Sequence, residues 1–572
     1  MNEPCRLAVS VFTAWRKLSL IATAALLGLP LLVILWVGVE LLIGGDYATL
    51  SHLWQTVVPE YIRHSLWLLL GVAVGVITLG VSTAWLTTAC RFPGQRLLTW
   101  ALLLPLAMPA YITAYTYTGM LDFAGPVQTM LRDTFGWGYG DYWFPQIRSL
   151  GGAILVLSLV LFPYVYLISR ATFIQQSATT LEAGRSLGLN PWQCFVRLAL
   201  PLARPAIVTG TTLALMETLA DYGTVAYFGV TTFTTGIFRT WYGLGDLNGA
   251  LQLAGMLLIA VIALMFLERW SRRQARYDQR SSRPAQPFQL HGAKAWLASL
   301  VCWLPLVFGF ILPALQLASW SLERWQVWVD PDFWQLTFNS FMLALIAAVI
   351  VVTMALWLGY GRRQLPTPAV RVSVTFAGLG YAIPGLVIAV GLLLVLSKLD
   401  HAIIALSKSW FDYNPGLLLS GTLFALLFAY VVRFLSVSLQ TINAGLAEIR
   451  PSMDEAARIQ GYRPLQVLRK IHLPLLRPSV LTALILVGVD VLKELPATLV
   501  LRPFDFNTLA VRAYEMAGDE RLADAGPPAL MMVLVGLIPV ILLSRAMLKS
   551  RHSQLTTPTN TTKESDFAPV TA

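Results

Sequence analysis

The sequence contains few charged residues for its length. Of 572 residues, 12% are Asp, Glu, Lys or Arg, 56% are hydrophobic, and the mean hydropathy is +0.65. A soluble domain usually has about a quarter of its residues charged. The shortage of charge argues against a soluble enzyme and predicts a polytopic membrane protein.

Cysteine and histidine are also scarce. The four cysteines and six histidines show no CxxC or Cys/His spacing, so we expect free thiols and no zinc site. The net charge of +11 does not indicate a nucleic-acid partner, because the basic residues lie beside apolar runs, as they do in cytoplasmic loops. We therefore predict no zinc site and no nucleic-acid binding, and we assign no metal ligands.

Sequence motifs for enzymatic chemistry are missing. No GxxxxGK[ST] occurs, so the chain has no P-loop to hold ATP phosphates. No Ser/His/Asp arrangement at the ends of the apolar runs suggests a membrane hydrolase. We predict that the chain has no catalytic residues and binds no cofactor.

Long apolar runs are what the sequence has in abundance. A helix needs about 20 apolar residues to cross a membrane, and the N-terminal run is too long for a cleaved signal. We expect an all-α polytopic membrane protein with about twelve transmembrane helices. The candidate runs are roughly 19–43, 66–89, 97–118, 150–174, 206–229, 249–268, 296–320, 339–360, 371–398, 415–438, 479–500 and 528–548.

Basic residues predict the orientation of these spans. Lys and Arg follow the second, fourth, sixth, eighth, tenth and twelfth runs, and the N-terminus is basic as well. Since cytoplasmic loops are enriched in Lys and Arg, both termini are expected in the cytoplasm. Membrane lipid is therefore one expected partner.

The chain contains an internal repeat. The stretch "LEAGRSLGLNPWQCFVRLALPLARP" at 181–205 recurs as "DEAARIQGYRPLQVLRKIHLPLLRP" at 454–478, an offset of 273 residues. "LPLAMPAY" around Pro109 matches "LGYAIPGL" around Pro384. Two similar halves in one orientation imply a pseudo-two-fold axis along the membrane normal, with a path between them. We predict a first half at 1–268, a basic linker at 269–295, a second half at 296–550 and a disordered tail at 551–572.

Each copy of the repeated segment predicts a helix, a glycine turn and a second helix. The expected signals are capping boxes at Thr179/Glu182 and Ser452/Glu455, C′ glycines at Gly188 and Gly461, an N-cap at Asn190 before Pro191, and helix ends at Pro201 and Pro474. An amphipathic helix resting on lipid headgroups is the alternative. The duplication and the glycine turn favour a docking element, because lipid requires no specific turn.

The repeated segment resembles the EAA motif of permease subunits of bacterial ABC importers. The matching residues are Glu182, Ala183, Gly184 and Gly188 in the first copy, and Glu455, Ala456, Ala457 and Gly461 in the second. Gly184 departs from the second Ala of the motif. The resemblance implies two fused permease domains of the type I importer fold, with coupling segments at about 180–201 and 453–474. It also implies a separate homodimeric ATPase that uses ATP and Mg, and a periplasmic substrate-binding protein in a bacterial inner-membrane system.

Two further stretches resemble the fused permeases of ferric-iron importers. They are "METLADYGTVAYFGV" in the first half and "LKELPATLVLRPFDF" in the second. The resemblance implies Fe(III) cargo. Related permeases carry thiamine, phosphonates or other small solutes, which stay open as alternatives. An ion-coupled secondary transporter and an integral-membrane enzyme are less favoured alternatives.

Ionisable residues inside the apolar runs are the candidates for a translocation path. They are Glu217, Asp221, Tyr222, Asp490, Lys493 and Glu494. Ionisable groups in a membrane usually face a cavity or a partner, and the acids lie four residues apart in each half, on one helix face. They could line a path for a hard cation, or form an interspan pair with Lys493 or a periplasmic gate bond.

Tyrosine and arginine residues near the span ends receive structural interpretations. Tyr111, Tyr115, Tyr117, Tyr164 and Tyr166 are expected in an interfacial aromatic belt rather than along an iron path. Arg170 and Arg433 are expected to reach toward lipid headgroups.

Overall fold

A computed structural model describes residues 17–30, 32–33, 36, 47–138, 140–175, 184, 186–273 and 287–555. Within these residues nearly every element is a helix, as the composition predicts. The only strands in the described ranges are β1 (Cys90–Arg91) and β2 (Phe288–Gln289), which pair in parallel. This pairing joins the end of α4 to the chain just before the second half.

The first half begins with the short apolar helix Lys17–Leu27. Its remaining elements are α3 (Tyr47–Thr56), α4 (Val58–Ala89), α5 (Gln95–Ala101), the 3-10 turn η1 (Leu104–Ala107), α6 (Ala110–Leu121), α7 (Pro126–Phe135), α8 (Leu150–Gln175), α10 (Pro191–Cys194), the π turn η2 (Phe195–Ala199), α11 (Leu200–Ala220), α12 (Gly223–Tyr227), α13 (Phe233–Phe238), the π turn η3 (Arg239–Gly243) and α14 (Leu247–Arg273).

The second half repeats much of this order, from α17 onward. Its elements are α15 (Ala293–Leu306), the π turn η4 (Val307–Ile311), α16 (Leu312–Glu323), the 3-10 turn η5 (Trp325–Val329), α17 (Pro331–Gln364), α18 (Pro368–Ala377), the 3-10 turn η6 (Gly380–Ala382), α19 (Gly385–Phe411), α20 (Leu423–Glu448), α21 (Pro451–Ile459), α22 (Pro464–Val467), the π turn η7 (Leu468–His472), α23 (Leu473–Leu475), α24 (Arg477–Lys493), α25 (Pro496–Leu501), α26 (Leu509–Gly518) and α27 (Leu522–Leu555).

The described helices are consistent with many membrane crossings. Nine of them are long and apolar enough to span a membrane, and the number rises to eleven if each of two bent pairs is one span. The bent pairs are Gln95–Ala107 with Ala110–Phe135, at 92°, and Pro464–Leu475 with Arg477–Lys493, at 77°. The polytopic all-α prediction is confirmed. Much of the first predicted run, 19–43, lies outside the described residues.

Proline placement corrects two predicted boundaries. Pro201 does not end a short helix, because one helix runs from Pro191 to Ala220. The π turn η2, in which the Leu200 N–H bonds to the Phe195 carbonyl, widens the helix just before Pro201 and lets it continue. In the second copy the helix does break, but after Leu475 rather than at Pro474.

The predicted span at 371–398 is divided in the structure. Helix α18 ends at Ala377, the turn η6 follows, and α19 begins at Gly385 with Pro384 as its N-cap residue. The first half has the same arrangement, with Pro109 preceding α6. The matched prolines therefore mark equivalent helix starts, which supports the internal repeat.

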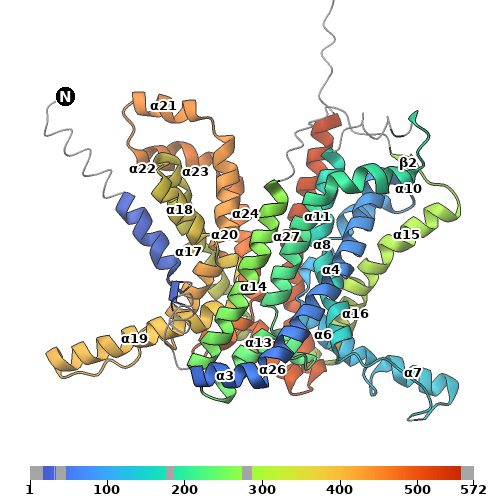
Figure 1. Ribbon diagram of the computed structural model, residues 1–572, viewed down its shortest axis with the longest axis horizontal. Helices are drawn as coiled ribbons and strands as arrows, with labels where there is room; N and C mark the ends of the chain where they lie inside the picture. Colours follow the sequence, from blue (N-terminus) through green and yellow to red (C-terminus); the bar gives the residue numbers. More distant parts are fainter. Residues whose placement is uncertain are drawn as a thin grey trace, which may run out of the picture.

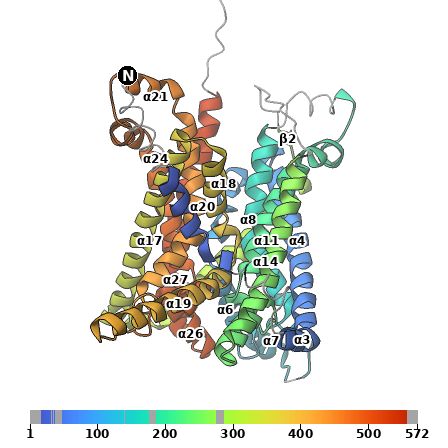
Figure 2. The same cartoon turned by 60° about the vertical axis from the view of Figure 1, so that its left-hand side comes forward.

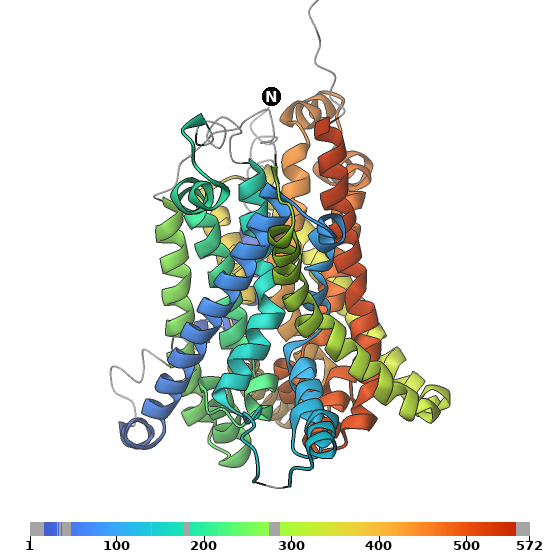
Figure 3. The same ribbon diagram turned by 90° about the vertical axis from the view of Figure 1, so that its right-hand side faces the viewer.

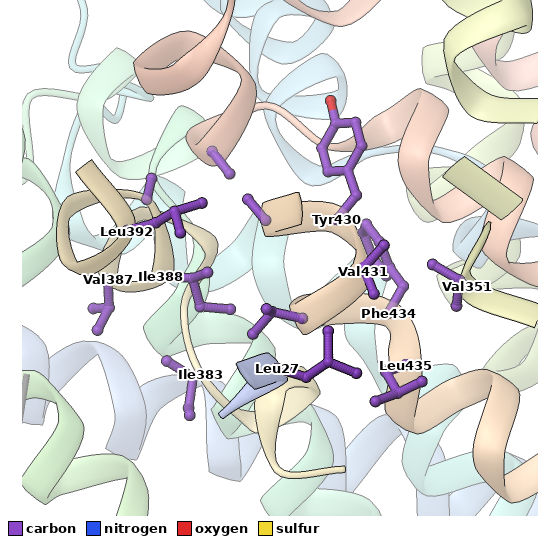
Figure 4. Close-up of a cluster of buried hydrophobic side chains, with 14 of the residues drawn as sticks. Leu27, Val351, Ile383, Val387, Ile388, Leu392, Tyr430, Val431, Phe434 and Leu435 are labelled. Atoms are coloured by element: carbon purple, nitrogen blue, oxygen red, sulfur yellow. The ribbon is translucent and has the colours of Figure 1, made fainter. Parts of the chain in front are cut away.

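The two halves interlock. Leu20, Ala24 and Leu27 of the N-terminal helix are buried in a cluster built mainly from the second half, and Figure 4 shows Leu27 among Val351, Tyr430 and Phe434. Conversely, α15 and α16 of the second half pack against α4 and α6 of the first. Figure 3 shows the yellow-green segment that contains α15 and α16 running obliquely across the molecule.

The repeated segments lie at one end of the molecule. Figure 1 shows α10, α21 and α22 at the top, with α13 and α26 at the bottom. The view in Figure 2 keeps α21 at the same end. The long helices run between these two ends.

Candidate functional site

A cavity of about 160 Å³ lies between the two halves. Its walls come from α6, α8 and α11 of the first half, and from α20, α24 and the turn before α19 of the second. All six residues that the sequence predicts for a path line this cavity. They are Glu217, Asp221, Tyr222, Asp490, Lys493 and Glu494.

Two of the four cavity acids serve as helix caps. Asp221 accepts hydrogen bonds from the N–H groups of Thr224 (3.0 Å) and Val225 (3.1 Å) at the start of α12. Glu494 accepts from the N–H groups of Ala497 and Thr498, both at 2.9 Å, at the start of α25. The predicted match between Asp221 and Glu494 is therefore seen in their contacts, and it gives both side chains a structural role.

The other two acids have no such partners. Glu217 and Asp490 lie one turn earlier on α11 and α24, half-buried and facing the cavity. Among the described residues, neither carboxylate has a hydrogen bond or an ion pair. Since a charged group removed from bulk water needs compensation, these two carboxylates are the ones free to interact with a group inside the cavity.

Lys493 links the two halves at the cavity wall. Its Nζ donates to the Leu106 carbonyl in the turn η1, at 2.9 Å. No carboxylate in the described ranges forms a direct ion pair with it, although Asp490 and Glu217 lie close enough to act on its charge. The predicted interspan pairing with an acid therefore stays a prediction. The Leu106 carbonyl can accept this bond because it lies in the last turn of η1, where backbone carbonyls lack helical partners. The repeat places Ala220 opposite Lys493, so the first half supplies no matching cation.

Arg433 is a cavity residue whose position was predicted wrongly. It is only 8% exposed, and its Nη1 lies 3.8 Å from Glu494 Oε1. A Cβ on Gly385 would meet both of these groups, so the first residue of α19 needs to be glycine here. Arg433 therefore does not reach toward headgroups, and Arg170 is equally buried. An arginine in the middle of an apolar run was the available signal.

The tyrosines are buried rather than gathered in an interfacial belt. Tyr111 and Tyr164 line the cavity, joined by Tyr381 of the second half. Tyr115, Tyr117 and Tyr166 are almost fully buried, and the Tyr166 hydroxyl donates to the Thr99 carbonyl at 2.7 Å. The belt prediction is wrong because α6 is enclosed by α12, α16 and α26 instead of facing lipid.

Tyrosine contacts join the halves at the end away from α21. The hydroxyls of Tyr222 and Tyr514 lie 3.4 Å apart. Tyr242 donates to the Leu499 carbonyl at 3.2 Å. Figure 1 places α13 and α26, which flank these contacts, at the bottom of the molecule. The halves are thus tied together beyond the cavity on that side.

The glycine turns of the two repeated segments have the predicted backbone. Gly188 has φ +78° and Gly461 has φ +80°, the left-handed region that favours glycine. In the second copy Glu455 and Ala456 are exposed on α21, whereas Ala457 is buried. In the first copy Glu182 and Ala183 lie outside the described residues. Gly184 is buried, and a Cβ there would meet Leu198, which explains the departure from Ala.

Capping in the repeated segments follows the prediction only in part. Asn190 caps α10, because its Oδ1 accepts from the Gln193 N–H at 2.8 Å and Gln193 reciprocates at 3.1 Å. The box at Ser452 and Glu455 is wrong, since α21 already begins at Pro451 without a side-chain cap. Proline is favoured at the first helical position, so Pro451 was the stronger start signal. Thr179 lies outside the described residues.

Both segments present an apolar side chain to the surroundings. Trp192 on α10 is 69% exposed and Leu465 on α22 is 72% exposed. The repeat offset makes these two positions equivalent. Exposed apolar groups beside a charged surface are typical of contact sites for a partner.

The described residues contain no group of three or more His, Cys, Asp or Glu side chains placed to hold a metal ion. The cavity acids are instead spread around its wall, two from each half. Such a wall can attract a cation without fixing it in a tight coordination sphere.

Comparison with known proteins agrees with this architecture. The family described as binding-protein-dependent transport system inner membrane component matches residues 77–277 and again 352–549. An Fe(3+)-transport system permease protein of Haemophilus influenzae is 26% identical over 550 residues, covering 94% of this chain and 99% of that protein. A molybdenum transport system permease protein of Escherichia coli is 30% identical over 203 residues, covering 34% of this chain and 86% of that protein. With one match in each half, the chain belongs to the family of inner-membrane permease components of binding-protein-dependent ABC importers and carries the permease domain twice.

Proposed function

We propose that this permease moves Fe(III) from a periplasmic binding protein across the inner membrane by alternating access. A separate homodimeric ATPase, using ATP and Mg, would supply the energy. The observation that carries the proposal is the cavity between the halves, with a free carboxylate from each half, Glu217 and Asp490, on its wall. Both termini and the linker would lie on the cytoplasmic side, and the halves 1–268 and 296–550 would rock against each other.

Cavity charge supports a cation as cargo. Its wall carries four acids, Glu217, Asp221, Asp490 and Glu494, against two bases, Arg433 and Lys493. The formal excess of negative charge favours a cation in a region with little water to screen it. Carboxylate and phenol oxygens are also the ligand types that a hard cation prefers.

A second candidate cargo is an oxyanion or another small solute, such as thiamine or a phosphonate. The resemblance to a molybdenum permease favours the oxyanion, since molybdenum in neutral water is the anion molybdate. The acid-rich wall argues against it. Arg433 and Lys493 are the residues that would have to hold such an anion.

The coupling segments are the proposed entry point for the ATPase motion. In this account the residues that contact the ATPase are Glu182, Ala183, Gly184 and Gly188 in the first half and Glu455, Ala456, Ala457 and Gly461 in the second. Trp192 and Leu465 support the proposal, because equivalent exposed apolar groups suit the two equal grooves of a symmetric dimer.

Uptake in a strain lacking this permease tests the cargo. Radiolabelled Fe(III) and molybdate are supplied separately, with the intact gene restored on a plasmid as the control. We expect the deletion to reduce Fe(III) uptake and the plasmid to restore it, with molybdate uptake unchanged. Normal Fe(III) uptake together with lost uptake of another solute would refute the iron assignment and leave the importer class intact.

A further inference from the structure

Asp454 in the second coupling segment makes contacts that bind the segment to the membrane-spanning helices. Its Oδ2 pairs with Arg363 Nε at the end of α17, at 2.9 Å. Its Oδ1 pairs with His472 Nε2 in the π turn η7. One carboxylate therefore joins α17 to both parts of the segment, α21 and the helix that follows the glycine turn.

Arg363 makes further bonds from the same guanidinium. It donates through Nη2 to the Ile449 carbonyl at 2.8 Å and through Nη1 to the Leu446 carbonyl. These carbonyls lie at the C-terminal end of α20, where the regular i to i+4 helical hydrogen bonds end. The side chain thus connects the ends of α17 and α20 with the start of the coupling segment.

His472 is held from a second side. Its side chain is completely buried, and the Tyr360 ring packs edge-to-face against it with centroids 5.3 Å apart. The Tyr360 hydroxyl donates to the Pro464 carbonyl at 2.7 Å, at the first residue of α22. Helix α17 therefore contacts both parts of the segment, through Arg363 and through Tyr360.

The first coupling segment cannot form the same cluster. The repeat offset of 273 residues places Leu181 opposite Asp454 and Ala199 opposite His472. Its described part includes aromatic contacts to the membrane-spanning helices. Trp85 lies 5.2 Å from Phe195 of η2 and 5.5 Å from Phe173 of α8, centroid to centroid.

We propose that Arg363, Asp454 and His472 form an ionic brace that positions the second coupling segment, so that the two ATPase docking sites are unequal. The inference rests on the proposed docking role of the segments. Directional charged bonds hold α21 to α17 and α20 as one rigid unit, whereas the first segment has Leu181 in place of the bridging carboxylate and Ala199 in place of the histidine. Displacement of the ATPase is therefore transmitted more stiffly through the second half.

The side chains are partly or fully buried, which makes the brace sensitive to removal of one partner. Side-chain exposure is 19% for Arg363, 16% for Asp454 and 0% for His472. Loss of one member of a buried pair leaves the other charge uncompensated, which is costly. Neutral replacements of Arg363 or Asp454 should loosen α21 without disturbing the spans.

Amide hydrogen exchange on the purified full chain tests the brace without any partner. The variants are Arg363→Gln and Asp454→Asn. Arg362→Gln is the matched control, because Arg362 is next to Arg363 in the sequence and forms no ion pair among the described residues. We expect exchange in α21 to accelerate about tenfold in the two brace variants, and to stay unchanged in the control and in α10. Equal exchange in Arg363→Gln and Arg362→Gln would overturn the brace.

Coupling in the complete importer gives the second readout. ATP hydrolysed per cargo ion transported is measured with the ATPase and binding protein present. We expect this ratio to rise several-fold in Asp454→Asn, with the ATPase still bound, and the double variant with Arg363→Gln to add little further. An unchanged ratio together with loosened α21 would overturn the positioning role. Full recovery of the ATPase with Gly461→Val would instead count against the proposed docking surface, and it would leave the brace that is measured by hydrogen exchange intact.

Discussion

Amide replacement of the cavity acids should separate a role in helix capping from a role in the translocation path, two roles that the sequence alone does not distinguish. Glu217→Gln and Asp490→Asn remove charges that have no hydrogen-bond partner among the described residues, so the free energy of unfolding should change by only about 0.5 kcal/mol. Asp221→Asn and Glu494→Gln instead weaken helix caps whose bonds are 2.9–3.1 Å long. Replacing a charged acceptor by a neutral one costs about 1 kcal/mol per bond.

Glu494→Gln has an additional cost. Arg433 lies 3.8 Å from the Glu494 carboxylate and is 8% exposed, so it would lose its nearest opposite charge. Breaking a buried ion pair from one side costs about 3–5 kcal/mol. Glu494→Gln should therefore be the least stable of the four variants, and thermal unfolding of the purified proteins would rank them.

Transport should follow a different order. A unit charge about 4 Å from a cation contributes about 4 kcal/mol at an effective dielectric constant of 20, so losing Glu217 or Asp490 should slow Fe(III) uptake by up to about a thousandfold. Initial uptake rates of all four variants, corrected for the amount of folded permease, give the test. Wild-type rates in both Glu217→Gln and Asp490→Asn would refute the assignment of these carboxylates to the path.

Four other substitutions have defined outcomes. Gly461→Val and Gly188→Val place a β-branched residue at positive φ, which costs about 1–2 kcal/mol. The amount of ATPase that co-purifies with the permease should therefore fall in these variants and stay unchanged in the control Gly518→Ala. Full recovery of the ATPase would contradict the role of the glycine turns in coupling. Lys493→Met removes the bond to the Leu106 carbonyl, so ATP hydrolysis without cargo should rise several-fold; an unchanged basal rate would exclude a restraining role. Asp400 accepts four hydrogen bonds from Leu418, Leu419 and Ser420; Asp400→Asn should lower the free energy of unfolding by about 1–3 kcal/mol, and an unchanged melting temperature would contradict this.

The repeat made the site partly predictable. A constant offset paired Asp221 with Glu494, and the structure shows both as caps of equivalent short helices. The glycine turns were also readable, because only a left-handed residue fits at Gly188 and Gly461. Local sequence carried these features, since capping and turn geometry depend on neighbours within a few residues.

Features that depend on contacts between distant parts of the chain could not be predicted from the local sequence. Tyr115 was predicted to lie in an interfacial belt, because the sequence does not show that α12, α16 and α26 pack around α6. Arg433 was predicted to contact lipid headgroups, because the sequence does not show the cavity that both halves form around it. The helix through Pro201 continues because a π turn precedes it, a backbone adjustment that proline position alone does not predict. The brace at Asp454 joins segments 91 residues apart.

Uptake into proteoliposomes measures directly which cargo the permease moves. The permease is reconstituted with its ATPase subunit and binding protein, ATP is supplied on the ATPase side, and labelled Fe(III) or molybdate on the other. We expect ATP-dependent accumulation of Fe(III) that is lost in Asp490→Asn, with no accumulation of molybdate. Accumulation of molybdate but not Fe(III), with Asp490→Asn fully active, would contradict it.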